Sequence, residues 1–308
     1  MANTNPRALL ADSSLRVNKK FSATYSNIYK KLSVSLDFKS NPMFLLISIY
    51  SLYKFVESQF NDLDNELDST VSDEIEYAYV LGFAVGLMAY YDSIKVAYTF
   101  TSVMAEASLG IDKAVLIKLK KVAMKDLLQV TKNTEYMTKK LIQDVMTKHL
   151  TINQMKNLGR DDLANLIIKD LTGKKLKGDI QQNMVAIVDK AGRRWNVDTY
   201  VDMVTRTKAQ EVYVKGMQTF ADKNGGNGDL AVIPHNPLTV DACKEFEGMI
   251  ISMTGATEGY PTYDELRSTG MIFHPRCRHT PQPYWSETDI PGDIMSKHQE
   301  VSAKINKL

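Results

Sequence analysis

The sequence is poor in the residues that would place it in several common classes of protein. It has 2 cysteines in 308 residues, too few for the disulfide scaffold of a small secreted domain. Its N-terminal segment, MANTNPRALLADSSLRVNKK, lacks the apolar core of a signal peptide. No proline occurs between 43 and 233, and this absence favours long helices in the first half of the chain.

Long apolar runs are scarce as well. The two strongest candidates, 41–56 and 77–91, are shorter than the roughly 20 residues that a helix needs to cross a bilayer. Charged residues also follow soon after each run. We therefore expect buried helices of a bundle and no membrane span. A membrane-active protein that ejects DNA, using 41–56 and 77–100, is one alternative function.

The net charge of +2 conceals blocks of a single sign. The first 31 residues are basic, 57–76 is acidic without a lysine or arginine, and 113–148 is rich in lysine. Such blocks either meet charged partners or form the solvated faces of helices. The charge pattern alone leaves both interpretations open.

The whole pattern predicts a fold of the α+β class that is mostly α, in which a long-helix N-terminal half precedes a small mixed α/β domain. The expected parts are a basic N-terminal arm (1–41), a helical domain (42–180), a compact α+β domain (181–287) and a C-terminal tail (288–308). Asn41 and Pro42 mark the start of a helix, since proline suits the first helical turn.

The segment 113–148 has the clearest helical pattern. At 100° per residue its apolar side chains fall on one stripe, formed by Leu116, Leu119, Ala123, Leu127, Val130, Met137, Leu141 and Val145. Five lysines fall on the opposite side: Lys118, Lys121, Lys125, Lys132 and Lys139. This row, roughly 30 Å long on a straight helix, could follow a DNA phosphate backbone without sequence preference. A solvated face is the alternative.

Local signals predict several further elements. A helix is expected from Ser72 to a stop near Gly110, and another from Asp198 that buries Val201, Val204, Thr205, Ala209, Val212 and Gly216. Strands are expected at 184–188 and 230–235. Thr262 and Glu265 predict a capping box for a short helix, and Gly270 suits the position after its C-terminus.

The residues capable of chemistry gather near the C-terminus. Cys243, His274, Cys277 and His279 offer thiolate and imidazole groups, the ligands of tetrahedral structural zinc sites. Pro275 biases His274 toward an extended backbone, along which Cys277 and His279 would point to the same side. Neither a C-x-x-C pair nor an H-x₃₋₅-H pair is present. Metal-free packing, a structural zinc, a disulfide and a catalytic cysteine therefore all remain open.

An enzyme built on the same cluster is the alternative to a structural role. A zinc-dependent hydrolase or nuclease needs an open coordination position and a nearby general base, for which Glu245 and Glu247 are the candidates. No motif supplies an oxyanion hole or a third group to orient a Cys–His pair. We therefore expect no enzymatic activity.

Several short motifs occur in a consistent order between about 185 and 285. They are GRRW (192–195), MVTRT (203–207) on a helix, CKEFEG (243–248), YPT (260–262) and HPRCRH (274–279). In this order they resemble the minor capsid proteins of tailed bacteriophages, the group that contains the MuF-like head-morphogenesis domain. The resemblance is most specific from about 185 to 285, whereas the helical first half is only loosely similar.

The resemblance implies a structural minor head protein, made in the bacterial host cytoplasm and assembled into the head interior of the virion. It implies association with the portal protein, with the interior of the major capsid protein and with packaged double-stranded DNA. The family's cysteine and histidine positions fall on Cys243, His274, Cys277 and His279, so a structural zinc ion is the one cofactor to consider. Many members carry another cysteine three residues before Cys243, where this sequence has Val240.

Overall fold

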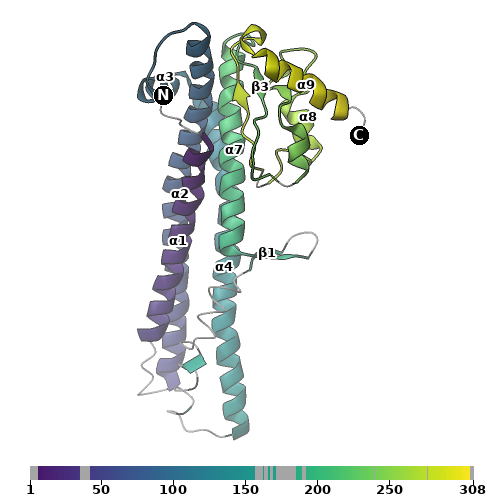
Figure 1. Cartoon of the computed structure of the whole chain (residues 1–308). Helices are drawn as coiled ribbons and strands as arrows, with labels where there is room; N and C mark the ends of the chain where they lie inside the picture. The colour runs from purple at the N-terminus through teal and green to yellow at the C-terminus, as the bar shows by residue number, and fades with distance from the viewer. Residues whose placement is uncertain are drawn as a thin grey trace. The chain divides into compact units, whose positions relative to one another are not determined.

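A computed structural model describes residues 6–34, 42–156, 162, 166, 169–170, 185–188, 192–239, 241–275 and 277–305. This part of the chain is mostly helical and carries a small antiparallel sheet toward its C-terminus (Figure 1), which confirms the predicted fold class. The chain divides into two compact units. The first comprises Met1–Ser14, Val71–Ala123 and Met203–Leu308, and the second Leu15–Thr70 and Met124–Asp202.

Long helices supply most of both units. They are α1 (Pro6–Val34), α2 (Pro42–Ser93), α4 (Lys113–Lys156) and α7 (Val197–Lys223), accompanied by the shorter α3 (Phe100–Gly110), α8 (Tyr263–Ser268) and α9 (Gly292–Ile305). The start of α2 at Pro42 is as predicted, and the segment expected to be a basic arm contains α1. Among the helices of the described residues, none combines the length and the apolar character needed to cross a membrane.

The strands are short. Strands β1 (Val185–Val188) and β2 (Arg194–Asn196) pair with each other, while β3 (Leu230–Val232) lies between β4 (Ile250–Ser252) and β5 (Gln282–Pro283). All of these pairs are antiparallel. Two 3₁₀ helices, η1 (Ala242–Phe246) and η2 (Glu287–Asp289), complete the elements of the C-terminal part. The strands β1 and β3 were predicted, whereas β4 and β5 are too short for a sequence period to reveal them.

The predicted start of a helix at Ser72 is wrong. Helix α2 passes through Ser72 without a break and ends at Ser93. The buried residues Val71 and Ile75 flank this serine at helical spacing, so the core side of α2 continues through it. Burial of these side chains therefore overrides the capping preference of Ser72.

A turn that the sequence pattern does not reveal separates α2 from α3. Lys95 adopts a positive φ of 59°, a conformation that ends a helix. Thr99 then caps α3, since its hydroxyl accepts from the Ser102 backbone N–H at 3.1 Å and the Ser102 hydroxyl accepts from the Thr99 N–H. The predicted stop at Gly110 is the end of α3 and is confirmed.

Among the described residues of the second unit, α1, α2 and α4 each bury one face. Helix α1 buries Val17, Phe21 and Ile28, and the first part of α2 buries Leu52, Val56, Phe60, Leu63 and Leu67 at intervals of three or four residues. Tyr25 and Phe60 meet edge to face with ring centroids 6.3 Å apart. These faces meet the second part of α4, and the apolar spacing of each helix explains its burial.

The buried face of α4 departs from the predicted stripe after Val130. Leu116, Ala123, Leu127 and Val130 are buried as expected, whereas farther along the fully buried positions are Thr131, Thr134, Thr138, Ile142, Met146 and His149. The threonine hydroxyls donate to carbonyls of the preceding turn, for example Thr134 to Val130 O at 2.6 Å. Since these hydroxyls are satisfied locally, threonine tolerates a place in the core that an apolar pattern would not assign to it.

In the first unit, α2 and α7 cross in direct backbone contact. A Cβ atom on Gly82 would overlap the carbonyl oxygen of Tyr213, and one on Gly216 would overlap that of Tyr79. Next to this crossing, the hydroxyls of Tyr79 and Thr219 are 2.8 Å apart. Glycine is therefore required at both positions for steric reasons.

The C-terminal elements assemble beside the end of α7 (Figure 1). Gln218 of α7 donates to Met253 O at 2.7 Å, and Phe220 lies 6.1 Å from Trp285 between ring centroids. Leu230, Ile250 and Ile290 form a cluster against which Ile294 and Met295 pack. The segment expected to be a C-terminal tail thus contains α9, one face of which packs on the sheet.

Three local predictions are confirmed in α7 and α8. The predicted burial along α7 holds for each of the six residues: Val201, Val204, Thr205, Ala209, Val212 and Gly216. Thr262 and Glu265 form a reciprocal capping box at the start of α8. Gly270 follows the helix with φ +69°, as expected for the residue after a helix end.

Candidate functional site

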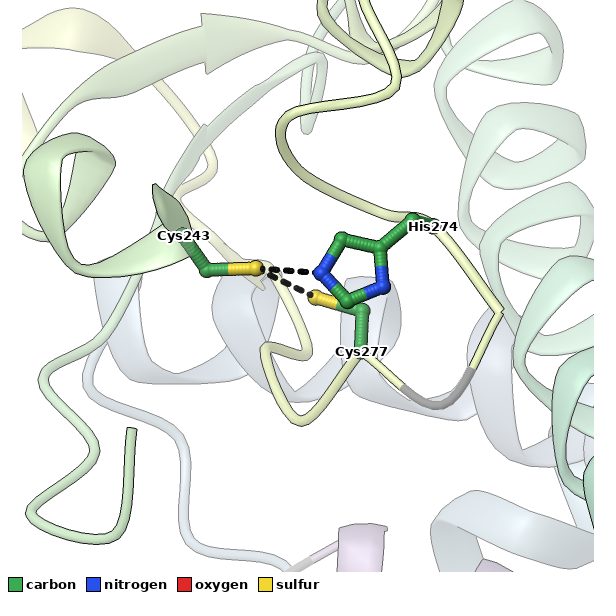
Figure 2. A group of neighbouring side chains, drawn as sticks. All are labelled: Cys243, His274 and Cys277. Carbon is green, nitrogen blue, oxygen red and sulfur yellow. Dashed lines mark hydrogen bonds between the residues drawn. The ribbon is translucent and has the colours of Figure 1, made fainter. Parts of the chain in front are cut away.

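Two distant parts of the chain bring three of the four predicted ligands together. Cys243 lies on η1, which begins behind the N-cap Asp241, and the loop after α8 carries His274 and Cys277. The Cys243 Sγ atom is 2.9 Å from His274 Nε2 and 3.5 Å from Cys277 Sγ (Figure 2). The three ligand atoms lie within 4.8 Å of one another. Their chemistry is that of a soft divalent metal site.

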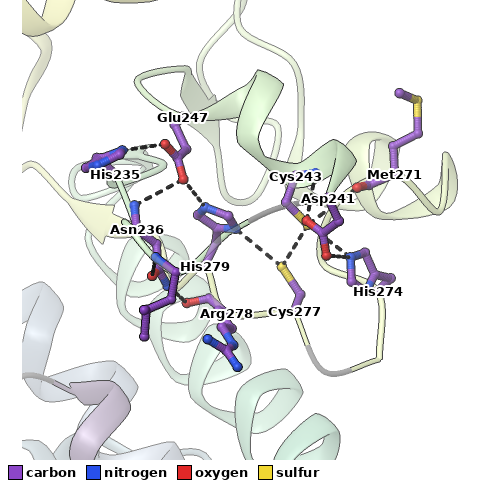
Figure 3. Close-up of polar contacts among 11 residues, drawn as sticks. His235, Asn236, Asp241, Cys243, Glu247, Met271, His274, Cys277, Arg278 and His279 are labelled. Carbon is purple, nitrogen blue, oxygen red and sulfur yellow. Dashed lines mark hydrogen bonds and ion pairs between the residues drawn. The ribbon is translucent and has the colours of Figure 1, made fainter.

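His279 joins this group through Cys277. Its Nδ1 atom is 3.6 Å from Cys277 Sγ, and its Nε2 atom is 2.9 Å from Glu247 Oε1 (Figure 3). The imidazole is 1% exposed, so its orientation is fixed by the surrounding core. All four predicted residues therefore belong to one continuous polar cluster.

Glu247 is the centre of the adjoining network and was predicted only as a general base. Its buried carboxylate is 2.5 Å from His235 Nδ1 and accepts from the Asn236 backbone N–H at 3.0 Å, in addition to its contact with His279. No sequence spacing signals this role, because its partners come from the segment after β3 and from the loop before β5. Burial opposes ionisation, but these hydrogen bonds outweigh it and lower the pKa of Glu247.

The two thiols differ in their ionisation. Burial raises the pKa of Cys243, and the neighbouring Cys277 raises it further. Burial also opposes ionisation of Cys277, but hydrogen bonding with His279 lowers its pKa below the ordinary cysteine value. Although burial disfavours a charged imidazole, Cys277 and Glu247 together raise the pKa of His279. Cys277 is consequently the thiol that ionises more readily.

The geometry offers little to the alternative of a zinc-dependent hydrolase or nuclease. The Glu247 carboxylate contacts His279 Nε2, the ring nitrogen remote from Cys277, and it is already engaged by three donors. Glu245 is exposed and lines a pocket of about 590 Å³ together with His235, Tyr284 and Lys297. The lining of this pocket includes none of the four predicted ligands.

The lysines of the predicted row differ in their exposure to solvent. Lys118, Lys121, Lys125 and Lys132 on α4 are exposed, whereas Lys139 is partly buried and pairs with Glu135 at 2.5 Å. The charge blocks of the sequence also neutralise one another in part. Lys120 pairs with Glu76 at 2.8 Å within the first unit, and Lys20 pairs with Glu66 at 3.1 Å within the second.

Two further residues shape the cluster. Asp241 caps η1 by accepting from the Cys243 backbone N–H at 3.2 Å, and its other oxygen lies 3.5 Å from His274 Nε2. An aspartate immediately before a short helical turn is a recognisable capping signal, so the sequence contained this information. Val240, which replaces the additional cysteine of many minor capsid proteins, lies outside the described residues.

Comparison with known proteins finds a family match for the part of the chain that holds this cluster. Residues 172–306 match the model of the family described as phage minor capsid protein 2. This match supports a phage minor capsid protein family. No curated protein and no solved structure matches it.

The match to the minor capsid family supports a structural role in a phage virion and implies assembly with other virion components. The matched segment contains η1, the loop from 271 to 279 and α9. The Cys243–His274–Cys277–His279 cluster thus lies within the segment that matches the minor capsid family, and outside the long helices α1, α2 and α4.

Proposed function

We propose that this minor capsid protein is an internal component of the phage head that associates with the portal protein, the interior of the major capsid protein and packaged DNA. The family match over residues 172–306 carries this proposal, since it gives a role in the virion. The order of the GRRW, MVTRT, CKEFEG, YPT and HPRCRH motifs, which resembles that of head-morphogenesis proteins, supports a role in the head.

Association with the portal is tested by co-expression. We expect the full chain to co-purify with assembled portal rings at a fixed ratio of copies per ring, measured by native mass spectrometry. Portal rings that remain free of this protein at concentrations where major capsid shells retain it would contradict the portal association.

The exposed part of the lysine row supports contact with DNA. Lys118, Lys121, Lys125 and Lys132 lie on one helix, α4, with exposed side chains. Ammonium groups that neutralise phosphates release counterions, so the logarithm of the binding constant falls linearly with that of the salt concentration. Four such contacts correspond to a slope of about 3 to 4 in magnitude, independent of DNA sequence.

The test compares two variants of equal charge. Replacement of Lys118, Lys121, Lys125 and Lys132 by glutamine is expected to remove most of the salt dependence of binding to a random duplex. The control replaces four exposed lysines outside α4, Lys169, Lys244, Lys297 and Lys304, and should retain it. Equal loss of affinity in both variants would mean that net charge, and not the row on α4, drives binding.

A further inference from the structure

The cluster around Cys243 approaches the dimensions of a tetrahedral zinc site. Zinc–sulfur bonds of about 2.3 Å and zinc–nitrogen bonds of about 2.0 Å place tetrahedral ligands about 3.8 Å apart for two sulfurs, and about 3.5 Å apart for sulfur and nitrogen. The Cys243–Cys277 distance is 3.5 Å. His279 Nδ1 lies 3.6 Å from Cys277 Sγ, but the group of ligand atoms within 4.8 Å of one another contains only Cys243, His274 and Cys277, so His279 must move toward the other two ligands to complete a tetrahedron. The Cys243–His274 distance of 2.9 Å is that of a hydrogen bond and would lengthen by roughly 0.6 Å on metal binding.

Both histidines are held in the orientation that a ligand requires. The Nδ1 atom of His274 lies 2.9 Å from Pro275 O, which leaves Nε2 toward Cys243. The Nε2 atom of His279 lies 2.9 Å from Glu247 Oε1, which leaves Nδ1 toward Cys277 (Figure 3). A carbonyl or carboxylate behind the remote ring nitrogen is the usual support of a metal-bound imidazole, because it fixes the tautomer.

The backbone of the ligand loop is also constrained. Phe273, immediately before His274, has a positive φ of 55°, although it is a bulky residue, and its ring packs 4.4 Å from that of Tyr263 between centroids. The Cys277 N–H then donates to His274 O at 2.9 Å, which closes a tight turn between the two ligands. A positive φ at a bulky residue costs free energy and is retained only where the surrounding structure enforces it. Here it helps to set the spacing between His274 and Cys277.

We infer that Cys243, His274, Cys277 and His279 bind one zinc ion as a closed structural site, with Glu247 as a positioning residue for His279. The two thiols release their protons to solvent on binding, so the ion and two thiolates form a centre without net charge. Such a centre is compatible with the buried Cys243 and His279. Four protein ligands leave no open position for a water nucleophile, which makes the site structural and not catalytic.

The site would join two segments that flank the central strand of the sheet. Cys243 follows β3 on η1, and the other three ligands precede β5. A zinc ion bound by both segments would hold them together in the folded state. The free energy of zinc binding would then add to the stability of the C-terminal elements. Portal and DNA association do not enter this inference, so its test is independent of them.

The experiment uses the full chain purified under reducing conditions and measures metal by mass spectrometry after dialysis. One zinc ion per chain is expected, and chelation should lower the thermal unfolding midpoint. Cobalt substitution should give the visible bands of a tetrahedral ion and a charge-transfer band from two thiolates. Both thiols remaining reactive in a chain dialysed against zinc alone, or a cobalt spectrum without thiolate bands, would overturn the assignment.

Variants identify the ligands even where one of them folds poorly. His279→Gln and Cys277→Ser are expected to lose stoichiometric metal, whereas Glu247→Gln should bind it about 10- to 100-fold more weakly. The control is Asp241→Asn, which keeps a capping oxygen for η1 but removes the carboxylate near His274. Retention of zinc by this control supports His279 as the fourth ligand. Loss of zinc in Asp241→Asn with retention in His279→Gln would refute it.

Discussion

The crossing of α2 and α7 can be tested with a single methyl group. A Cβ atom on Gly216 would overlap Tyr79 O and would lie 2.8 Å from Phe83 N and 3.0 Å from Gly82 Cα. These are backbone atoms, so no side-chain rotation relieves the overlap and the helices must separate. Tyr79 is fully buried beside the crossing and would lose contacts as they do.

The magnitude follows from two opposing terms. Overpacking of a core typically costs 1 to 3 kcal/mol, and an overlap with backbone belongs at the upper end, about 3 kcal/mol. Alanine in place of glycine inside a helix stabilises the folded state by about 1 kcal/mol, because alanine has the higher helix propensity. Gly216→Ala should therefore reduce the free energy of unfolding by about 2 kcal/mol. With a urea dependence of about 3 kcal/mol per M, the midpoint falls by about 0.7 M.

The assay is urea unfolding followed by circular dichroism, with Gly292→Ala as the matched control. Gly292 opens α9, and a Cβ atom there meets nothing within 4 Å, so the control midpoint should shift little. Gly82→Ala should resemble Gly216→Ala, and the double variant should cost less than the sum, because the helices need to separate once. A Gly216→Ala midpoint at or above that of the wild type would show that the two backbones do not touch.

Two further predictions concern buried polar groups of the C-terminal part. Asp229, 1% exposed, accepts from the Ser252 hydroxyl at 2.5 Å and from the Thr254 N–H and hydroxyl at 2.7 Å, so Asp229→Asn should cost about 3 kcal/mol in chemical unfolding. Burial opposes ionisation of Asp229, but these hydrogen bonds outweigh it and lower the pKa of Asp229. The ionised carboxylate therefore stabilises the fold above the ordinary carboxyl pKa. This stability should be lost as the pH falls through the lowered pKa of the folded state. His298 Nδ1 accepts from the Ile250 N–H at 3.0 Å, and burial lowers its pKa. The stability that neutral His298 provides should therefore fall as pH drops below the ordinary histidine value, and the pH profile of thermal unfolding should be flatter in His298→Asn, whose side-chain oxygen can still accept the bond.

The ligand cluster shows how far residue types alone can lead. The four positions follow from the residue types alone, since both cysteines of the chain and two of its histidines lie in its C-terminal part. Glu247 could be assigned only a general-base role from sequence, because its contacts with His235, Asn236 and His279 depend on how the segments after β3 and before β5 meet. Such contacts between segments far apart in the chain have no local signal.

The helices show the same division. The period of apolar residues predicts that 113–148 is helical and buries Leu116, Ala123, Leu127 and Val130. It cannot predict that Thr134 and Thr138 are buried farther along, because their neighbours on other helices decide which side of α4 faces the core. The same limitation explains the false start at Ser72, a good capping residue placed between core positions.

The sequence by itself determined the mostly helical class, the capping box at Thr262 and Glu265, and the ordered motifs that resemble those of phage minor capsid proteins. All of these depend on local periodicity, local backbone preference or residue order. Tertiary structure decided that Gly82 and Gly216 meet and that Cys243 lies against His274 and Cys277. These contacts join segments more than 30 residues apart, and their geometry exists only once packing fixes the strands and helices that carry them.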